Sequence, residues 1–263
     1  MGYKVDYHIH SWFSDGTMKP TELVRKYHEE GYDIISITDH DGVDGIEEAL
    51  IAGEAVKIQV VTGVELAVEH NGLNLHMLGY KFDHENEEFL DKMDELRQYR
   101  DERNEKLLKA LQDMGYDITM DDVKQRKRQT YVGKPNFARA LVAKGYVGSV
   151  KEAFEEGKFL CAPEIKEIER KKITAKEAID LIQNAGGMAV LAHPGKIKNI
   201  GERGSQEYWD NFEALLRDLK KQGLKGLECF YPDHSEEEQL KFAILAGKYH
   251  LHMTEGSDYH GDK

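Results

Sequence analysis

The sequence predicts an α/β fold in which strands and helices alternate around a parallel sheet, with a helical insertion in the middle of the chain. Short β-branched or apolar runs recur with helical stretches between them, which is the rhythm of strand–helix repeats. This rhythm stops between about residues 91 and 172. At 263 residues the chain is long enough for one large core and a smaller second domain.

Seven short runs have the composition of strands. In chain order they are 4–9, 33–38, 58–64, 73–78, 188–192, 226–230 and 252–254. Helix start signals fall between them. Pro20 suits a first helical turn, and Thr174 with Glu177, like Ser235 with Glu238, has the spacing of a capping box. We therefore expect helices after the first, fourth and sixth of these runs.

The middle of the chain is charged and helical in character, without a convincing strand. We expect residues 1–95 and 174–263 to form the two parts of the sheet domain and residues 96–173 to form the insertion. On an otherwise acidic chain, a basic cluster lies inside this insertion: Lys124, Arg126, Lys127 and Arg128, followed by Lys134 and Arg139. Such a cluster is either a solvated helix face or a cap that steers phosphate towards a site.

The composition excludes several classes of protein. With 49 acidic and 36 basic residues the net charge is −13, which argues against general coating of nucleic acid, so any affinity for phosphate must be local. No apolar run approaches the roughly 20 residues that span a bilayer, and the first residues lack a signal-peptide segment. Cys161 and Cys229 are isolated and predict neither disulfides nor a thiolate zinc site. We expect a cytoplasmic protein.

Histidine and carboxylate side chains gather at the ends of the expected strands. His8 and His10 are two residues apart, so both rings point to the same side and can share one ion. A single histidine near a strand end usually has a packing role, but strand ends on one face of a barrel share a single crevice. The candidate ligands are His8, His10, Asp15, His40, Glu65, His76, His193, Asp258 and His260.

Imidazole and carboxylate without thiolate suit Zn²⁺, Mn²⁺ or Fe²⁺ and disfavour an all-oxygen Mg²⁺ or Ca²⁺ site. Nine ligands are too many for one ion, so we expect two or three ions with a bridging carboxylate such as Glu65. A multinuclear site of this kind lowers the pKa of a bridging water, orients a phosphoryl group and stabilises the entering and leaving oxygens. Amide hydrolysis uses a related His-x-His site, and the local basic charge favours phosphate esters.

The order of these motifs resembles the PHP (polymerase and histidinol phosphatase) superfamily over nearly the whole chain. The motifs are His8-Ile9-His10, Asp15-Gly16, Thr38-Asp39-His40-Asp41, Gly63-Val64-Glu65, His76, His193-Pro194 and Gly256-Ser257-Asp258-Tyr259-His260-Gly261. The resemblance implies a distorted seven-stranded (β/α) barrel with a small inserted helical cap. It also implies three ions, held by His8, His10, Glu65 and Asp258, by Asp15, His40 and His260, and by Glu65, His76 and His193.

The insertion and the segment 228–235 look like the stand-alone branch of this superfamily. The resemblance then implies removal of the 3′-phosphate from nucleoside 3′,5′-bisphosphates, or trimming of short 5′-phosphorylated RNA. Relatives usually carry Arg-Pro-His where this chain has Lys134-Pro135-Asn136, which replaces a bidentate guanidinium with a point charge and removes an imidazole. Lys134 and Arg139 are the expected phosphate contacts, although both could simply solvate the cap.

Three functions compete at this point. The first is a phosphoesterase acting on a small nucleotide or an oligonucleotide end, and the second is a phosphatase for histidinol phosphate or another small phosphomonoester. The third is a non-catalytic module that binds metal and nucleotide, which would have lost ligands that this chain retains. Asp41 and His234 are the candidate catalytic residues. His234 opens a loop beside the crevice and could protonate the leaving alkoxide, or it could be a surface histidine before the Ser235 cap.

Overall fold

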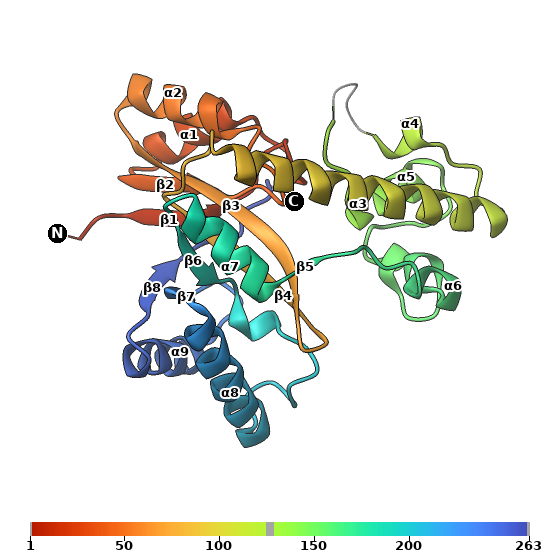
Figure 1. The fold of residues 1–263 in the computed structure, drawn as a ribbon. Coiled ribbons are helices and arrows are strands. Elements are labelled where there is room, and N and C mark those ends of the chain that lie inside the picture. Colours follow the sequence, from red (N-terminus) through yellow and green to blue (C-terminus); the bar gives the residue numbers. More distant parts are fainter. Residues whose placement is uncertain (1, 125–128, 262–263) are drawn as a thin grey trace.

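The computed structural model describes residues 2–124 and 129–261, and its centre is a nearly closed barrel (Figure 1). The strands are β1 (Val5–Ile9), β2 (Ile34–Ile37), β3 (Gln59–His70), β4 (Leu73–Tyr80), β6 (Met188–Leu191), β7 (Gly226–Phe230) and β8 (His252–Glu255), hydrogen-bonded in that order. A two-residue strand, β5 (Ile173–Thr174), pairs with β3 beside this path. A bridge between Ile9 and Tyr259 brings the last segment beside β1. The predicted α/β barrel is confirmed.

The expectation of a parallel sheet is wrong for β4, which runs antiparallel to both β3 and β6. The physical reason lies in the two residues between β3 and β4, Asn71 and Gly72, whose φ angles are +50° and +81°. An Asn-Gly pair with positive φ at both positions favours the tight turn of a hairpin, so the chain reverses without a helix. The pairs β1–β2, β2–β3, β6–β7 and β7–β8 are parallel.

The helices that cover the barrel are α1 (Pro20–Glu29), α2 (Ile46–Val56), α7 (Ala175–Asn184), α8 (Gln206–Gln222) and α9 (Glu236–Lys248). Three of them, α1, α7 and α9, begin where the sequence indicates. Pro20 is the first residue of α1. The side chains of Thr174 and Ser235 accept hydrogen bonds from the amides of Glu177 and Glu238, as expected of capping boxes. Among the described helices, none combines the length and apolar character that a membrane crossing requires.

The insertion has a hydrophobic core of its own and is joined to the barrel by one long helix, α3 (Glu87–Asp113). The first half of α3 buries Phe89 and Leu96 in the barrel core, and the second half buries Leu107 and Leu111 in the core of the insertion. The predicted boundary at residue 96 thus falls inside a continuous helix.

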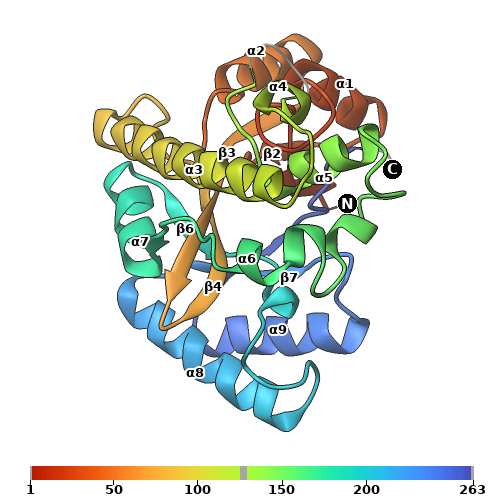
Figure 2. The same ribbon diagram turned by 90° about the vertical axis from the view of Figure 1, so that its right-hand side faces the viewer.

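The rest of the insertion comprises α4 (Met120–Val123), α5 (Lys134–Ala143), the 3₁₀ turns η1 (Glu152–Phe154) and η2 (Phe159–Cys161), and α6 (Pro163–Lys166). These elements form a lobe at one side of the barrel (Figures 1 and 2). No strand occurs in the described part of this lobe. Of the basic cluster, Arg126, Lys127 and Arg128 lie outside the described residues.

Candidate metal centre

The nine candidate ligands come from six of the seven barrel strands or from the loops that follow them, and they meet at one end of the barrel. Glu65 is the middle of the cluster and is fully buried. Its Oε2 lies 3.3 Å from Nε2 of both His8 and His10 and 3.0 Å from Nδ1 of His40. Its Oε1 lies 2.9 Å from His76 Nδ1 and 2.9 Å from His193 Nε2. One carboxylate therefore connects five imidazoles.

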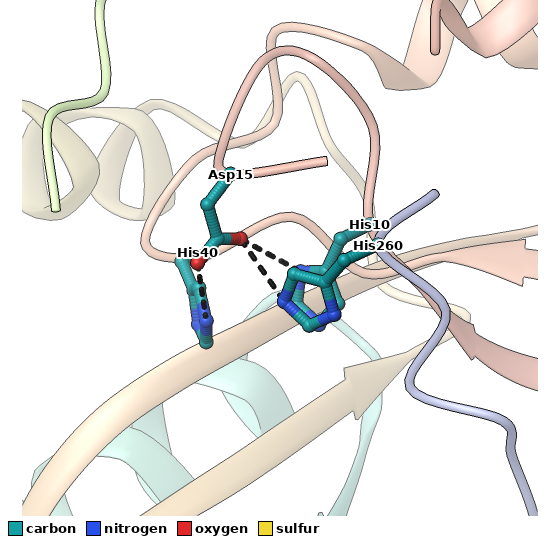
Figure 3. A group of neighbouring side chains, drawn as sticks. All are labelled: His10, Asp15, His40 and His260. Atoms are coloured by element: carbon teal, nitrogen blue, oxygen red, sulfur yellow. Dashed lines mark ion pairs between the residues drawn. The ribbon is translucent and has the colours of Figure 1, made fainter. Parts of the chain in front are cut away.

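Three groups of side chains have ligand atoms within 4.8 Å of one another. They are His8, His10, Glu65 and Asp258; His10, Asp15, His40 and His260; and His40, Glu65 and His76. Figure 3 shows the second group, in which Asp15 lies between His40 and the stacked rings of His10 and His260. The first group has the members that the family resemblance implies. The second also includes His10, and the third includes His40 where the resemblance implies His193.

Four buried atoms of these groups have no hydrogen-bond partner among the described residues. They are His8 Nε2, His10 Nε2, Asp15 Oδ1 and Glu65 Oε2. Buried polar atoms are normally satisfied, because leaving one unpaired costs about 1 to 3 kcal/mol. Imidazole nitrogens and carboxylate oxygens that face one another without a partner are the donor set for divalent transition-metal ions. The residues thus fit a multinuclear metal centre.

Burial and neighbouring charge shape the ionisation of the centre. Burial alone would raise the pKa of Glu65, but the imidazoles of His76, His8 and His40 lower it well below its usual range. For His40, burial dominates and lowers the pKa to about 3, although Glu65 and Asp15 act in the opposite direction. These two shifts favour an anionic Glu65 and a neutral His40, the forms in which both groups bind metal. For His8 and His10 the facing carboxylates outweigh burial and raise the pKa, so these two imidazoles must give up a proton to bind an ion.

Behind the ligands lies a buried carboxylate that sequence reasoning missed, that of Glu228 on β7. Its Oε1 accepts a hydrogen bond from His8 Nδ1 at 2.9 Å, and its Oε2 accepts one from the backbone N–H of His193 at 2.6 Å. Holding Nδ1 as the donor leaves Nε2 of His8 free to coordinate an ion. The signal available in the sequence was a single acidic residue within the apolar strand Gly-Leu-Glu-Cys-Phe. A carboxylate is rarely buried in a strand unless it is paired with another group.

Asp39 is a second buried carboxylate that orients the residues around the centre. It is buried and accepts hydrogen bonds from the backbone N–H of Ser11 and from the hydroxyls of Ser11 and Ser14. The Ser14 hydroxyl also lies 3.4 Å from Nδ1 of His10. Asp39 thus fixes the loop that follows β1 and carries Asp15.

Asp41, a predicted catalytic residue, does not belong to the ligand groups and is buried between the barrel and the insertion. Its Oδ2 accepts hydrogen bonds from Arg100 and Arg170, and its Oδ1 accepts one from the backbone N–H of Ala67 at 3.1 Å. Burial would raise the pKa of Asp41, but the guanidinium groups of Arg170 and Arg100 hold it at about 2. Its carboxylate is thereby committed to two arginines.

A basic pocket of about 430 Å³ lies between the metal centre and the insertion, within the size range of small-ligand sites. Its inner wall includes His40 and His76. The outer wall carries six cationic side chains: Arg100, Arg103, Lys134, Lys166, Arg170 and Lys172. Burial, with the positive charges of Arg100 and Arg170, lowers the pKa of Arg103 to about 10. Crowded cations of this kind favour a bound anion.

Of the two predicted phosphate contacts, Lys134 lines the basic pocket and Arg139 does not. Asn136 is buried, and its Oδ1 accepts a hydrogen bond from the backbone N–H of Gly133 at 2.9 Å, which caps the start of α5. Asn136 therefore serves its own helix. It is not among the residues that line the pocket.

His234, the predicted general acid, is buried, and both ring nitrogens have partners. Nδ1 lies 3.1 Å from the carbonyl oxygen of Cys229, to which it donates, and Nε2 accepts a hydrogen bond from the backbone N–H of Gly195 at 3.1 Å. Burial lowers the pKa of this imidazole and favours its neutral form. In this arrangement both ring nitrogens are bound to the protein backbone.

The comparison with known families decides what this cluster belongs to. The family model of the PHP domain matches residues 6–229. The chain belongs to the PHP family. A 5′-3′ exoribonuclease from Haemophilus influenzae is 29% identical over 99% of this chain and 91% of its own length. A 3′,5′-nucleoside bisphosphate phosphatase from Chromobacterium violaceum is 28% identical, with 97% of this chain and 87% of the relative covered.

Other relatives of this PHP protein differ in the reaction for which they are named. A phosphoribosyl 1,2-cyclic phosphate 1,2-diphosphodiesterase from Eggerthella lenta is 28% identical over 97% of this chain and 94% of its own length. The solved structure of an amidohydrolase from Chromobacterium violaceum, with bound sulfate and no metal, superimposes with a TM-score of 0.87 at 28% identity, covering 98% of this chain and 88% of that one. Family membership and these relatives identify the chain as a metal-dependent phosphoesterase.

Proposed function

We propose that this PHP protein removes the 3′-phosphate of nucleoside 3′,5′-bisphosphates or trims short 5′-phosphorylated oligonucleotides, using two or three Mn, Zn or Fe ions. The observation that carries this proposal is the basic pocket beside the metal centre. Six cationic side chains surround it on a chain whose net charge is −13. Such a local concentration of positive charge suits a second phosphate, one that is bound but not cleaved.

Both substrates carry two phosphates on one nucleotide, which matches two adjacent sites. The phosphate to be cleaved would lie at the metal centre, and the 5′-phosphate would lie in the basic pocket. Arginine binds phosphate bidentately, so Arg103 and Arg170 would fix its orientation as well as its position. Binding energy from this remote phosphate then supports alignment at the reacting phosphorus. The names of two relatives, a bisphosphate phosphatase and an exoribonuclease, support the same substrates.

Divalent ions held by the three ligand groups would supply the Lewis acidity that activates a water and neutralises charge on the phosphoryl group. The protein's own residues supply orientation. Glu228 fixes the ring of His8, and Asp41 fixes the guanidinium groups of Arg100 and Arg170. We therefore propose that Asp41 positions the basic pocket and takes no part in proton transfer.

The substrate is tested by assaying adenosine 3′,5′-bisphosphate, histidinol phosphate and p-nitrophenyl phosphate with the wild type and with Lys134→Ala. We expect the bisphosphate to be the best substrate. We also expect Lys134→Ala to lower its kcat/KM by about 10- to 100-fold, in line with the loss of a charge-assisted hydrogen bond. The aryl ester has no second phosphate, so its kcat/KM should barely change.

Arg139→Ala is the matched control, because Arg139 is on the same helix as Lys134 but does not line the pocket. It should leave both substrates unaffected. A wild-type enzyme that prefers histidinol phosphate, or treats all three esters alike, would instead be a general phosphomonoesterase.

His234 is expected to act through the loop that it supports. His234→Ala removes the acceptor for the Gly195 amide and should lower kcat by a similar factor for a nucleotide and for an activated aryl phosphate. A general acid would show a different pattern, because a poor leaving group depends on protonation far more than nitrophenolate does. Measuring kcat for both substrates separates the two roles, and a loss confined to the nucleotide would restore His234 as the acid.

A further inference from the structure

A second pocket adjoins the metal centre and is lined by barrel residues alone. Its volume is about 700 Å³. It lies along β4 and the segment His193–Arg203, which contains the 3₁₀ turn η3 (Pro194–Lys196). Asn74 and His76 of β4 line both this second pocket and the basic pocket. The two pockets therefore meet at a candidate metal ligand, with β4 between them.

The second pocket differs from the basic pocket in its chemistry. Its wall includes the apolar side chains of Leu75, Ala192 and Ile197, all of which are buried. Its size and apolar wall suit a base with its sugar better than a bare phosphate.

Three cationic side chains line this pocket, Lys196, Lys198 and Arg203, and they differ in their ion pairs. Lys196 is paired with Asp258 at 2.8 Å, and Arg203 is paired with Glu238 at 2.7 Å. Lys198 is exposed and has no ion pair within the described parts of the chain. Lys198 is thus the cation available to a further phosphate.

The two candidate substrates use these pockets differently. In a nucleoside bisphosphate the scissile phosphate is a monoester. The nucleotide then occupies the basic pocket, and no further substituent on the scissile phosphate reaches the second pocket. In an oligonucleotide the scissile phosphate is a diester with a second arm. We propose that the second pocket binds that arm, the nucleoside joined through its 5′-oxygen to the scissile phosphate, with the next phosphate at Lys198. This proposal rests on the proposed function, because it places the first nucleotide in the basic pocket.

The reaction then leaves a product that can be a substrate again. Water forms the new bond to phosphorus, the bond from phosphorus to the 3′-oxygen of the first nucleotide breaks, and that oxygen takes up a proton. The first nucleotide leaves as a nucleoside 5′-monophosphate. The shortened chain keeps the phosphate on its new 5′-end, which is the group that the basic pocket binds. Stepwise trimming follows from the two pockets lying side by side.

The test compares substrates that differ only in the second arm. One pair is 5′-phosphorylated triadenylate and adenosine 3′,5′-bisphosphate. The other is thymidine 3′-phosphate 5′-(p-nitrophenyl phosphate) and p-nitrophenyl phosphate, which share one leaving group. Lys198→Glu should lower the ratio of diester to monoester kcat/KM about tenfold or more in both pairs, because it reverses the charge beside the far phosphate. Lys225→Glu, an exposed site just before β7 at the opposite end of the barrel, should leave both ratios unchanged.

Each outcome decides between the two proposals. The second-pocket assignment would be overturned if Lys198→Glu left the ratio of diester to monoester kcat/KM unchanged. It would also be overturned if the wild-type enzyme cleaved neither diester. A wild-type enzyme that cleaves the aryl diester in a Lys198-dependent manner, yet leaves adenosine 3′,5′-bisphosphate intact, would overturn the proposed nucleotide function. The second pocket would then still be assigned to the second arm of a phosphodiester.

Discussion

Glu65→Gln should lower kcat for phosphate ester hydrolysis by at least about a thousandfold and reduce the metal content of the purified protein. The substitution keeps the shape of the side chain and removes the negative charge that faces five imidazoles. Because Glu65 belongs to two of the ligand groups, more than one of the proposed ions would lose a ligand. A loss of about 4 kcal/mol in transition-state stabilisation corresponds to that factor.

The measurement is metal content per chain by mass spectrometry, together with kcat on one nucleotide and one aryl phosphate. Glu54→Gln, an exposed glutamate on α2, is the matched control and should retain both activity and metal. Full metal content with low activity would show that Glu65 acts in the reaction and does not hold ions. Normal values of both would place the centre elsewhere.

Asp41→Asn should lower kcat/KM for adenosine 3′,5′-bisphosphate about 100-fold and affect p-nitrophenyl phosphate far less. The carboxylate is buried between Arg100 and Arg170, and without its charge the two guanidinium groups repel each other and lose their shared acceptor. Breaking a buried pair of this kind costs about 3 to 5 kcal/mol, so the free energy of unfolding should fall as well. Both effects follow from a positioning role.

Asp44→Asn is the control for this change, since Asp44 pairs with Arg97 at the surface at 2.9 Å. Exposed pairs contribute about 0 to 1 kcal/mol, so neither stability nor selectivity should shift noticeably. If Asp41→Asn depressed both substrates by the same factor, Asp41 would take part in the reaction itself. The catalytic role predicted for Asp41 from the sequence would then be correct.

The strands, and the gathering of the candidate ligands at one end of the barrel, could be predicted because both depend on local pattern. Apolar runs between helical stretches mark the strands, and the ends of such strands share one face of a barrel. The Asn71-Gly72 turn was also present in the sequence. Seven similar apolar runs nevertheless suggested a repeated strand–helix unit, which predicted parallel strands throughout. Which candidate ligands lie close enough to share an ion could not be derived from spacing, because it depends on how β3 pairs with β4 and brings His76 close to Glu65.

The basic pocket was predicted only in part, for a different reason. Arg100 and Arg103 are three residues apart and share a face of α3, but nothing local distinguishes that face from a solvated one. Arg170 joins them from the far end of the insertion. In the sequence, the basic residues near 124–128 suggested a phosphate-steering cap. The pocket is instead lined by cations that only the tertiary structure brings together.

The continuity of α3 has a consequence for how molecules reach the active site. A helix of 27 residues spans about 40 Å and bends little. The first connection between the barrel and the insertion is therefore rigid. The return connection is anchored as well, because Arg170 is bound to Asp41. With both attachments stiff, we expect the insertion to behave as a fixed wall. Substrate would then diffuse into a preformed opening, and turnover would not wait for a closing movement.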